Sequence, residues 1–144
     1  PMTQVYNTDQ IAKALRQEEG YRRFAYEDSV GFATIAIGRC IAEGHGYGID
    51  EDEAMWLLGR DIERVAKDCE GAFNFWNDVS NNIRETLIML VFQMGLAGVQ
   101  RFSKMLHAIE TADWPESAVQ LLDSRFATQT PARAKRMAKR LARG

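Results

Sequence analysis

The sequence predicts an α+β fold in which a small β-hairpin lobe is joined by a long helix to a larger helical lobe. Two short β-like runs, residues 24–26 and 32–37, flank an Asp-Ser-Val-Gly turn, and most of the chain after residue 50 has helical periodicity. The chain has 144 residues, of which 46% are hydrophobic, enough for one domain of common size. We expect a small lobe over about residues 20–60, and a larger lobe formed by 1–19 and 61–144.

The first predicted helix ends at Glu19. Thr8 or Asp9 is the expected N-cap and Gly20 the C-terminal stop. Its apolar positions are Ile11, Ala12, Ala14 and Leu15. A carboxylate in the last turn lies at the negative end of the helix dipole, which favours its protonated form. Glu19 is therefore suited to act as a general acid.

The hairpin that follows brings a second carboxylate and a hydroxyl. Asp28 falls in the turn, where Gly31 can adopt positive φ. Thr34 lies on the second strand, on the same face as Phe32 and Ala36, while the opposite face is apolar. One acid to protonate a leaving oxygen and one carboxylate to hold a water form the apparatus of a glycosidase. Spacing alone would favour two solvated surface acids, and it is the helix end and the hairpin around the pair that support a catalytic role.

The remaining segments read as helices. Asp50 is the expected N-cap, and Glu53 its capping-box partner, of a helix that continues as the connector between the lobes. Its apolar residues are Ala54, Leu57, Leu58, Ile62 and Val65. Residues 83–94 are apolar almost all round, as in a helix buried at the centre of a bundle. Segments 99–109, 114–122 and 131–141 supply three more helices.

Three motifs, in the same order and with similar spacing, resemble the phage-type lysozymes (endolysins). The first combines Glu-Gly at 19–20, Tyr-x-Asp at 26–28 and Gly-x-x-Thr-Ile-x-Ile-Gly at 31–38. The second is Met-Leu-Val-Phe-Gln-Met-Gly at 89–95, and the third begins Ser-Arg-Phe-Ala-Thr-Gln-Thr-Pro at 124–131. The resemblance covers most of the chain and implies a lysozyme-like fold.

The resemblance also implies roles for individual residues. Glu19 would be the general acid, Asp28 the carboxylate that activates or orients water, and Thr34 the hydroxyl that holds this water. It further implies inversion by single displacement at the β-1,4 bond between N-acetylmuramic acid and N-acetylglucosamine in bacterial peptidoglycan, for host cell lysis.

Substrate-binding and supporting residues follow from the same resemblance. Phe92 and Gln93 would line the cleft that holds the sugar rings, although a Phe in so apolar a run is equally typical of a core. Arg133 would lie close to Glu19, where its charge would lower the pKa of the acid and oppose the helix dipole. The sequence leaves open which of these effects is larger.

The chain departs from the family pattern at two informative positions. Arg39 stands where the family has a histidine, and Asp61 is the acid expected to pair with it. Phe126 replaces a tryptophan whose indole could have fixed the Gln93 amide, so we expect a looser Gln93.

Composition argues against a metalloprotein and against a membrane-spanning protein. Cys40 and Cys69 lack the spacing of a metal cluster, so we expect free thiols, no metal and no cofactor. No run of about 18 apolar residues and no leader is found, so we expect no stable membrane insertion and a cytoplasmic product. We also expect a monomer. With the resemblance, this implies an enzyme that stays in the host cytoplasm before lysis and acts on the wall after release.

The C-terminal segment is strongly basic although the formal net charge is −2. Six cations follow Pro131 with no acid among them: Arg133, Lys135, Arg136, Lys139, Arg140 and Arg143. An ordinary solvated helix is the favoured interpretation, because cations suit the end of the helix dipole. Binding to an anionic wall polymer stays open, and nucleic-acid binding is disfavoured because no aromatic residue interrupts the run.

Two other functions stay open as alternatives to a hydrolase. A lytic transglycosylase would use Glu19 alone and form an anhydro sugar. A non-catalytic peptidoglycan-binding module would bind the wall without turnover. The presence of Asp28 and Thr34 argues against both, because neither function needs a held water.

Overall fold

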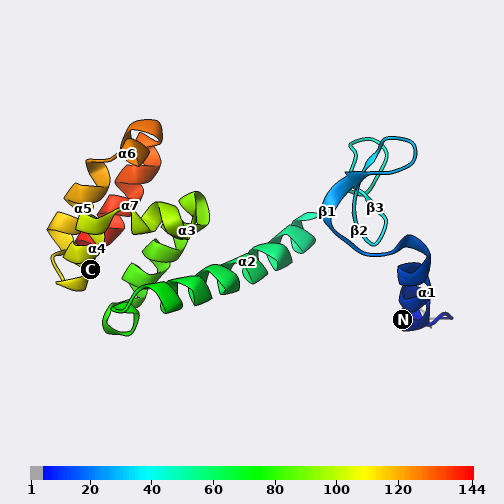
Figure 1. The fold of residues 1–144 in the computed structure, drawn as a ribbon, viewed down its shortest axis with the longest axis horizontal. Coiled ribbons are helices and arrows are strands. Elements are labelled where there is room, and N and C mark those ends of the chain that lie inside the picture. Colours follow the sequence, from blue (N-terminus) through cyan, green and yellow to red (C-terminus); the bar gives the residue numbers. More distant parts are fainter. Residues whose placement is uncertain (1–4) are drawn as a thin grey trace. The chain divides into compact units, whose positions relative to one another are not determined.

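A computed structural model describes residues 5–144 and divides the chain into two compact units, Pro1–Trp56 and Leu57–Gly144 (Figure 1). The division falls inside the long helix α2 (Glu51–Ala72). The sheet lies in the first unit and helices α3 to α7 in the second, as an α+β lysozyme-like fold requires. The grouping of residues 1–19 with the larger lobe stays a prediction.

Helix α1 (Thr8–Glu19) opens the first unit. The side chain of Asn7 accepts a hydrogen bond from the Gln10 amide at 3.0 Å, so Asn7 is the N-cap and the predicted cap at Thr8 or Asp9 was wrong by one or two positions. Gly20 ends the helix as predicted, with φ of 71° and its N–H donating to the Arg16 carbonyl. Glu19 is thereby fixed as the last helical residue.

Three strands form an antiparallel sheet in the order β1-β2-β3: β1 (Arg22–Glu27), β2 (Ala33–Ala36) and β3 (Arg39–Cys40). Thr34 lies opposite Tyr26 on one side and Cys40 on the other. The hairpin was predicted, but the short third strand was not. The turn between β2 and β3 contains Gly38, which has φ of 70°, a conformation that favours glycine.

Helix α2 starts with the predicted capping box. Asp50 accepts a hydrogen bond from the Glu53 amide at 2.8 Å, and the Glu53 carboxylate accepts one from the Asp50 amide at 3.4 Å. The bond from the Glu53 amide holds the pKa of Asp50 below its ordinary value. Glu53 also forms an ion pair with Arg39, whose guanidinium donates to the Gly48 carbonyl as well. Within its own unit Arg39 thus pairs with Glu53, and Asp61 pairs with Arg64 at 3.6 Å, so the predicted Arg39–Asp61 pair stays a prediction.

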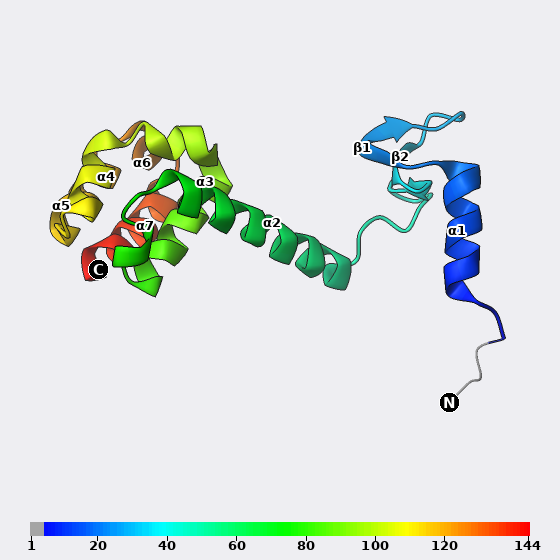
Figure 2. The ribbon, with the colours of Figure 1, turned by 60° about the horizontal axis from the view of Figure 1, so that its bottom comes forward.

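The second unit is built around α3 (Asn81–Gln100), in which Ile83, Leu87 and Leu90 are fully buried, as predicted for a central helix. Gly95, with φ of 79°, interrupts it. Further along the chain are α4 (Ser103–Glu110), α5 (Trp114–Leu122), α6 (Arg125–Gln129) and α7 (Pro131–Arg143), and a 3-10 turn, η1 (Trp76–Asp78), precedes α3. Helix α7 packs against α5, α3 and α6 (Figures 1 and 2).

Two helix limits differ from the prediction. The segment 99–109 is not one helix, because the chain leaves α3 after Gln100 and restarts at Ser103. Helix α6 was not predicted. It is a single short turn capped by Ser124, whose hydroxyl accepts from the Ala127 amide at 3.2 Å.

Within residues 5–144 no single helix is long and apolar enough to cross a membrane, and the α3–α4 pair that reaches the required length and hydropathy together is bent by 103°. Both cysteines are free. Burial raises the pKa of the Cys69 thiol to about 11, because a thiolate is poorly solvated in a core.

Candidate active site

The Glu19 carboxylate lies against the turn between β2 and β3. A methyl group built on Gly38 would come within 2.8 Å of Glu19 Oε2 and 3.0 Å of its carboxyl carbon. The absence of a side chain at Gly38 therefore leaves the space that the predicted acid occupies. Because Gly38 also has positive φ, two independent constraints favour glycine at this position.

The Asp28 carboxylate is held by backbone groups of its own turn. Its Oδ1 accepts hydrogen bonds from the amides of Val30 at 3.0 Å and Phe32 at 2.8 Å. The Asp28 amide donates to the Phe32 carbonyl at 2.9 Å, and the Gly31 amide to the Asp28 carbonyl at 3.0 Å. Among the described residues nothing donates to Oδ2, so this oxygen can accept a hydrogen bond from a water.

Thr34 is the one buried residue of β2, at 4% exposure. Its hydroxyl donates to the Phe32 carbonyl at 2.9 Å, which leaves its oxygen lone pairs as acceptors. On the same face Phe32 is half-buried and Ala36 is exposed, so Thr34 is the buried point of that face. Ile35 on the opposite face is half-buried and Ala33 is exposed.

Phe32 links Asp28 and Thr34, a role that was not predicted from the sequence. Its amide holds the Asp28 carboxylate and its carbonyl holds the Thr34 hydroxyl. Its ring stacks on His45 with centroids 4.1 Å apart. The spacing of an Asp four residues before an aromatic strand start was the available signal, because Asp side chains commonly bind amides of their own turn.

The first unit therefore arranges its predicted catalytic residues along β2. Asp28 precedes the strand, Thr34 lies on it, and Glu19 lies against the turn that follows it. Two carboxyl groups, one of them with a free oxygen, and a hydroxyl therefore lie on or beside one small sheet, which can support proton transfer and hold a nucleophilic water.

The second unit contains a hollow of about 410 Å³ that includes the two predicted substrate-binding residues. Phe92 is 50% exposed, so it is not a core residue. The hollow is lined by Leu58, Ile62, Glu85, Ile88, Met89, Phe92, Gln93 and Arg140. Arg133 is exposed on α7 and is not among the lining residues. Its predicted place beside Glu19 stays a prediction.

The model of the family described as phage lysozyme matches residues 16–142 of this chain. The chain belongs to the phage lysozyme family. The match spans both units and all three motifs. This member of the family is accordingly a glycoside hydrolase of the lysozyme class.

Relatives with curated names agree with this assignment. The chain is 29% identical to a probable T4-type lysozyme 2 of Dictyostelium discoideum, over 85% of this chain and 88% of the relative. It is also 29% identical to the pre-baseplate central spike protein Gp5 of Enterobacteria phage T4, over 88% of this chain but only 26% of Gp5. A peptidoglycan hydrolase, gp36 of Pseudomonas phage phiKMV, is 26% identical over 90% of this chain and 15% of gp36. The same domain thus occurs alone and inside longer proteins.

Proposed function

We propose that this chain lyses bacterial peptidoglycan by hydrolysing the β-1,4 bond between N-acetylmuramic acid and N-acetylglucosamine, with inversion at the anomeric carbon. Family membership and the name of the gp36 relative support peptidoglycan as the substrate. The observation that carries the mechanism is the shared anchoring of Asp28 and Thr34 on the Phe32 backbone.

Hydrogen-bond directions define what each group would do. The Thr34 proton is already donated to the Phe32 carbonyl, so Thr34 can bind a water only by accepting one of its protons. Asp28 Oδ2 would accept the other proton. The water would then direct a lone pair at the sugar, and Asp28 would draw off its proton as it attacks. Glu19 would protonate the leaving oxygen.

Inversion is the outcome that this arrangement favours. Asp28 and Glu19 lie beyond opposite ends of β2. Room for a water between two carboxyl groups, about 6.5 to 9.5 Å apart, is the hallmark of inverting enzymes, whereas retaining enzymes hold them about 5 to 5.5 Å apart. The water-holding role of Thr34 also has no counterpart in a mechanism where Asp28 attacks directly.

The decisive experiment is proton NMR of freshly cleaved muropeptides, read before mutarotation. We expect the α-anomer. A β-anomer would contradict inversion, and a 1,6-anhydro sugar would instead indicate a lytic transglycosylase. Binding of sacculi without any release of reducing ends would indicate a non-catalytic module.

The role of the acid is tested by Glu19→Gln. The amide keeps the shape of the side chain but cannot deliver a proton, so we expect turnover to fall at least about 100-fold with an unchanged thermal midpoint. Wild-type clearance of walls by the folded variant would remove Glu19 from the mechanism.

We also propose that the enzyme serves host cell lysis, accumulating in the host cytoplasm before it reaches the wall. Expression in a Gram-negative host with and without a pore-forming membrane protein tests this role. Lysis only when the pore is present is expected, and lysis of cells with an intact inner membrane would contradict it.

A further inference from the structure

A second hollow in the unit Leu57–Gly144 has an unusual lining. It measures about 370 Å³ and is lined by Met89, Arg136, Met137, Lys139, Arg140 and Arg143. We call it the basic hollow. Its cations recur three, four and seven residues after Arg136, so they form a single face of α7. Its two methionines are its only apolar lining residues.

The charge of the basic hollow is not balanced within the second unit. Arg140 pairs with Glu85 at 3.0 Å, but no acidic partner of Arg136, Lys139 or Arg143 is found among the described residues. Like charges three and four residues apart weaken a helix. The chain as a whole carries a formal net charge of −2, so this cluster is not the consequence of a generally basic surface.

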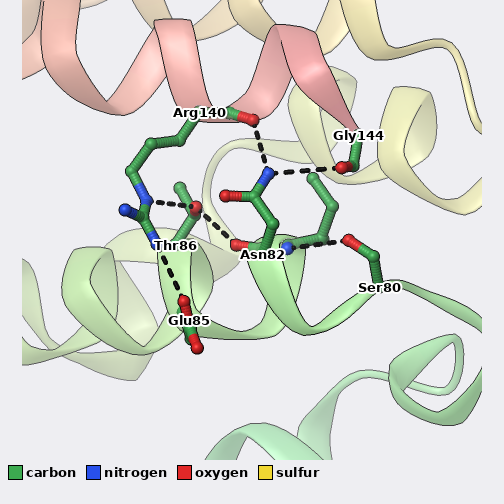
Figure 3. Close-up of polar contacts among 7 residues, drawn as sticks. Ser80, Asn82, Glu85, Thr86, Arg140 and Gly144 are labelled. Atoms are coloured by element: carbon green, nitrogen blue, oxygen red, sulfur yellow. Dashed lines mark hydrogen bonds and ion pairs between the residues drawn. The ribbon is translucent and has the colours of Figure 1, made fainter.

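Arg140 is fixed in place by contacts between α3 and α7 (Figure 3). Its Nε donates to Thr86 Oγ1 at 3.1 Å, and the fully buried Thr86 hydroxyl donates to the Asn82 carbonyl at 2.7 Å. The Asn82 amide group in turn donates to the carbonyls of Arg140 at 2.8 Å and Gly144 at 3.3 Å. A guanidinium held in this way loses little conformational entropy when it binds a ligand.

The basic hollow adjoins the hollow that contains Phe92 and Gln93, because Met89 and Arg140 line both. We propose that the basic hollow binds a linear phosphate polymer of the bacterial envelope, of the polyol-phosphate kind. Four cations and one carboxylate leave three positive charges, which closely spaced phosphates neutralise better than a single carboxylate. Guanidinium groups also match phosphate oxygens in geometry.

A base-free polymer fits this lining better than a nucleic acid. Proteins that bind single-stranded nucleic acids stack the bases on aromatic side chains, and none of the six lining residues is aromatic. The proposal goes beyond the proposed function, since it concerns how the enzyme is held on an envelope and not which bond it cuts.

The test compares two double variants of equal charge change. Lys139→Ala with Arg143→Ala removes two lining cations, while Lys135→Ala with Arg125→Ala removes two exposed cations outside the hollow. Calorimetric titration with inorganic tripolyphosphate should show affinity about tenfold or more weaker for the first pair and nearly unchanged for the second. Affinity of the wild type should fall as salt rises, because exposed charges are screened. Equal losses in both pairs would overturn the proposal.

Two further arms fix the ligand class. An abasic oligonucleotide should bind as tightly as oligo(dT) of the same length, and tighter binding of oligo(dT) would indicate base recognition and overturn the proposal. Citrate binding as tightly as tripolyphosphate would overturn the preference for phosphate. Both double variants should hydrolyse sacculi stripped of phosphate polymers at the wild-type rate. Loss of this activity in the first pair alone would overturn the proposal, because the hollow would then act in cleavage itself. An inactive wild type would count against the proposed function only.

Discussion

Replacing Gly38 by alanine tests whether the position of the Glu19 carboxylate controls the rate. The added methyl group would lie 2.8 Å from Glu19 Oε2, while ordinary van der Waals contact begins at 3.4 Å. The carboxylate must therefore move by about 0.6 Å or the turn must shift. Since a displacement of about 1 Å at a reacting group can lower the rate about 100-fold, we expect kcat to fall about tenfold or more.

The substitution also strains the backbone, which requires a matched control. Gly38 has φ of +70° and Gly44 has φ of +80°, but a methyl group on Gly44 meets no atom within 4 Å. Alanine in the left-handed region costs about 1 to 2 kcal/mol at either position. Gly38→Ala and Gly44→Ala should thus lose comparable unfolding free energy, while only Gly38→Ala should lose turnover.

The assay is release of reducing ends from purified sacculi at saturating substrate, with urea denaturation of each variant alongside. A kcat that stays at the wild-type value in Gly38→Ala would refute the reasoning, because it would mean that the Glu19 side chain moves away without loss of function. A large fall in both would assign the effect to backbone strain in the first unit.

Three further outcomes concern stability. Ser80→Ala removes the N-cap of α3, whose hydroxyl accepts a hydrogen bond from the Ile83 amide at 3.1 Å. Urea denaturation should show a loss of about 1 kcal/mol in unfolding free energy, and almost no loss for Ser103→Ala, which changes an exposed serine that caps no helix. Ala36 has φ of 60°, so relief of left-handed strain by Ala36→Gly should exceed the added chain entropy and raise the unfolding free energy by about 0.5 to 1 kcal/mol; a fall would contradict this. The Cys69 pKa is raised from 9.0 to about 11. The unfolded thiol therefore loses its proton first as pH rises, and stability should fall by up to about 2 to 3 kcal/mol between pH 9 and 11; the same fall in Cys69→Ala would exclude the thiol as its cause.

Features set by neighbouring residues were predictable from the sequence. The Asp50–Glu53 capping box, the stop at Gly20 and the limits of α5 all depend on contacts within one helical turn or on one residue's backbone preference. The burial of Ile83 and Leu87 followed from a helix that is apolar almost all round.

The ion-pair partners of charged side chains were less predictable, and Arg39 is the example. Its expected partner was Asp61, taken from the position of an acid in the family pattern. The guanidinium is longer than the imidazole it replaces and bonds to the Gly48 carbonyl at 3.1 Å as well as pairing with Glu53. Glu53 is at the same time the capping-box partner of Asp50 at the start of α2. One carboxylate therefore serves both a helix start and a loop, and the sequence pattern indicated only the first.

The difference in sequence separation explains why the hairpin that holds Asp28 and Thr34 was predictable and the basic hollow was not. Asp28 and Thr34 are held by Phe32, four and two residues away along the chain. Arg140 is held by Thr86, 54 residues away, and its carbonyl by Asn82, 58 residues away. Turn and strand periodicities carry the first kind of contact, but only the packing of α7 against α3 creates the second. The six C-terminal cations were visible as a basic run. What made four of them candidates for a binding site was the hollow beside α3 and the fixed Arg140, neither of which helical periodicity could reveal.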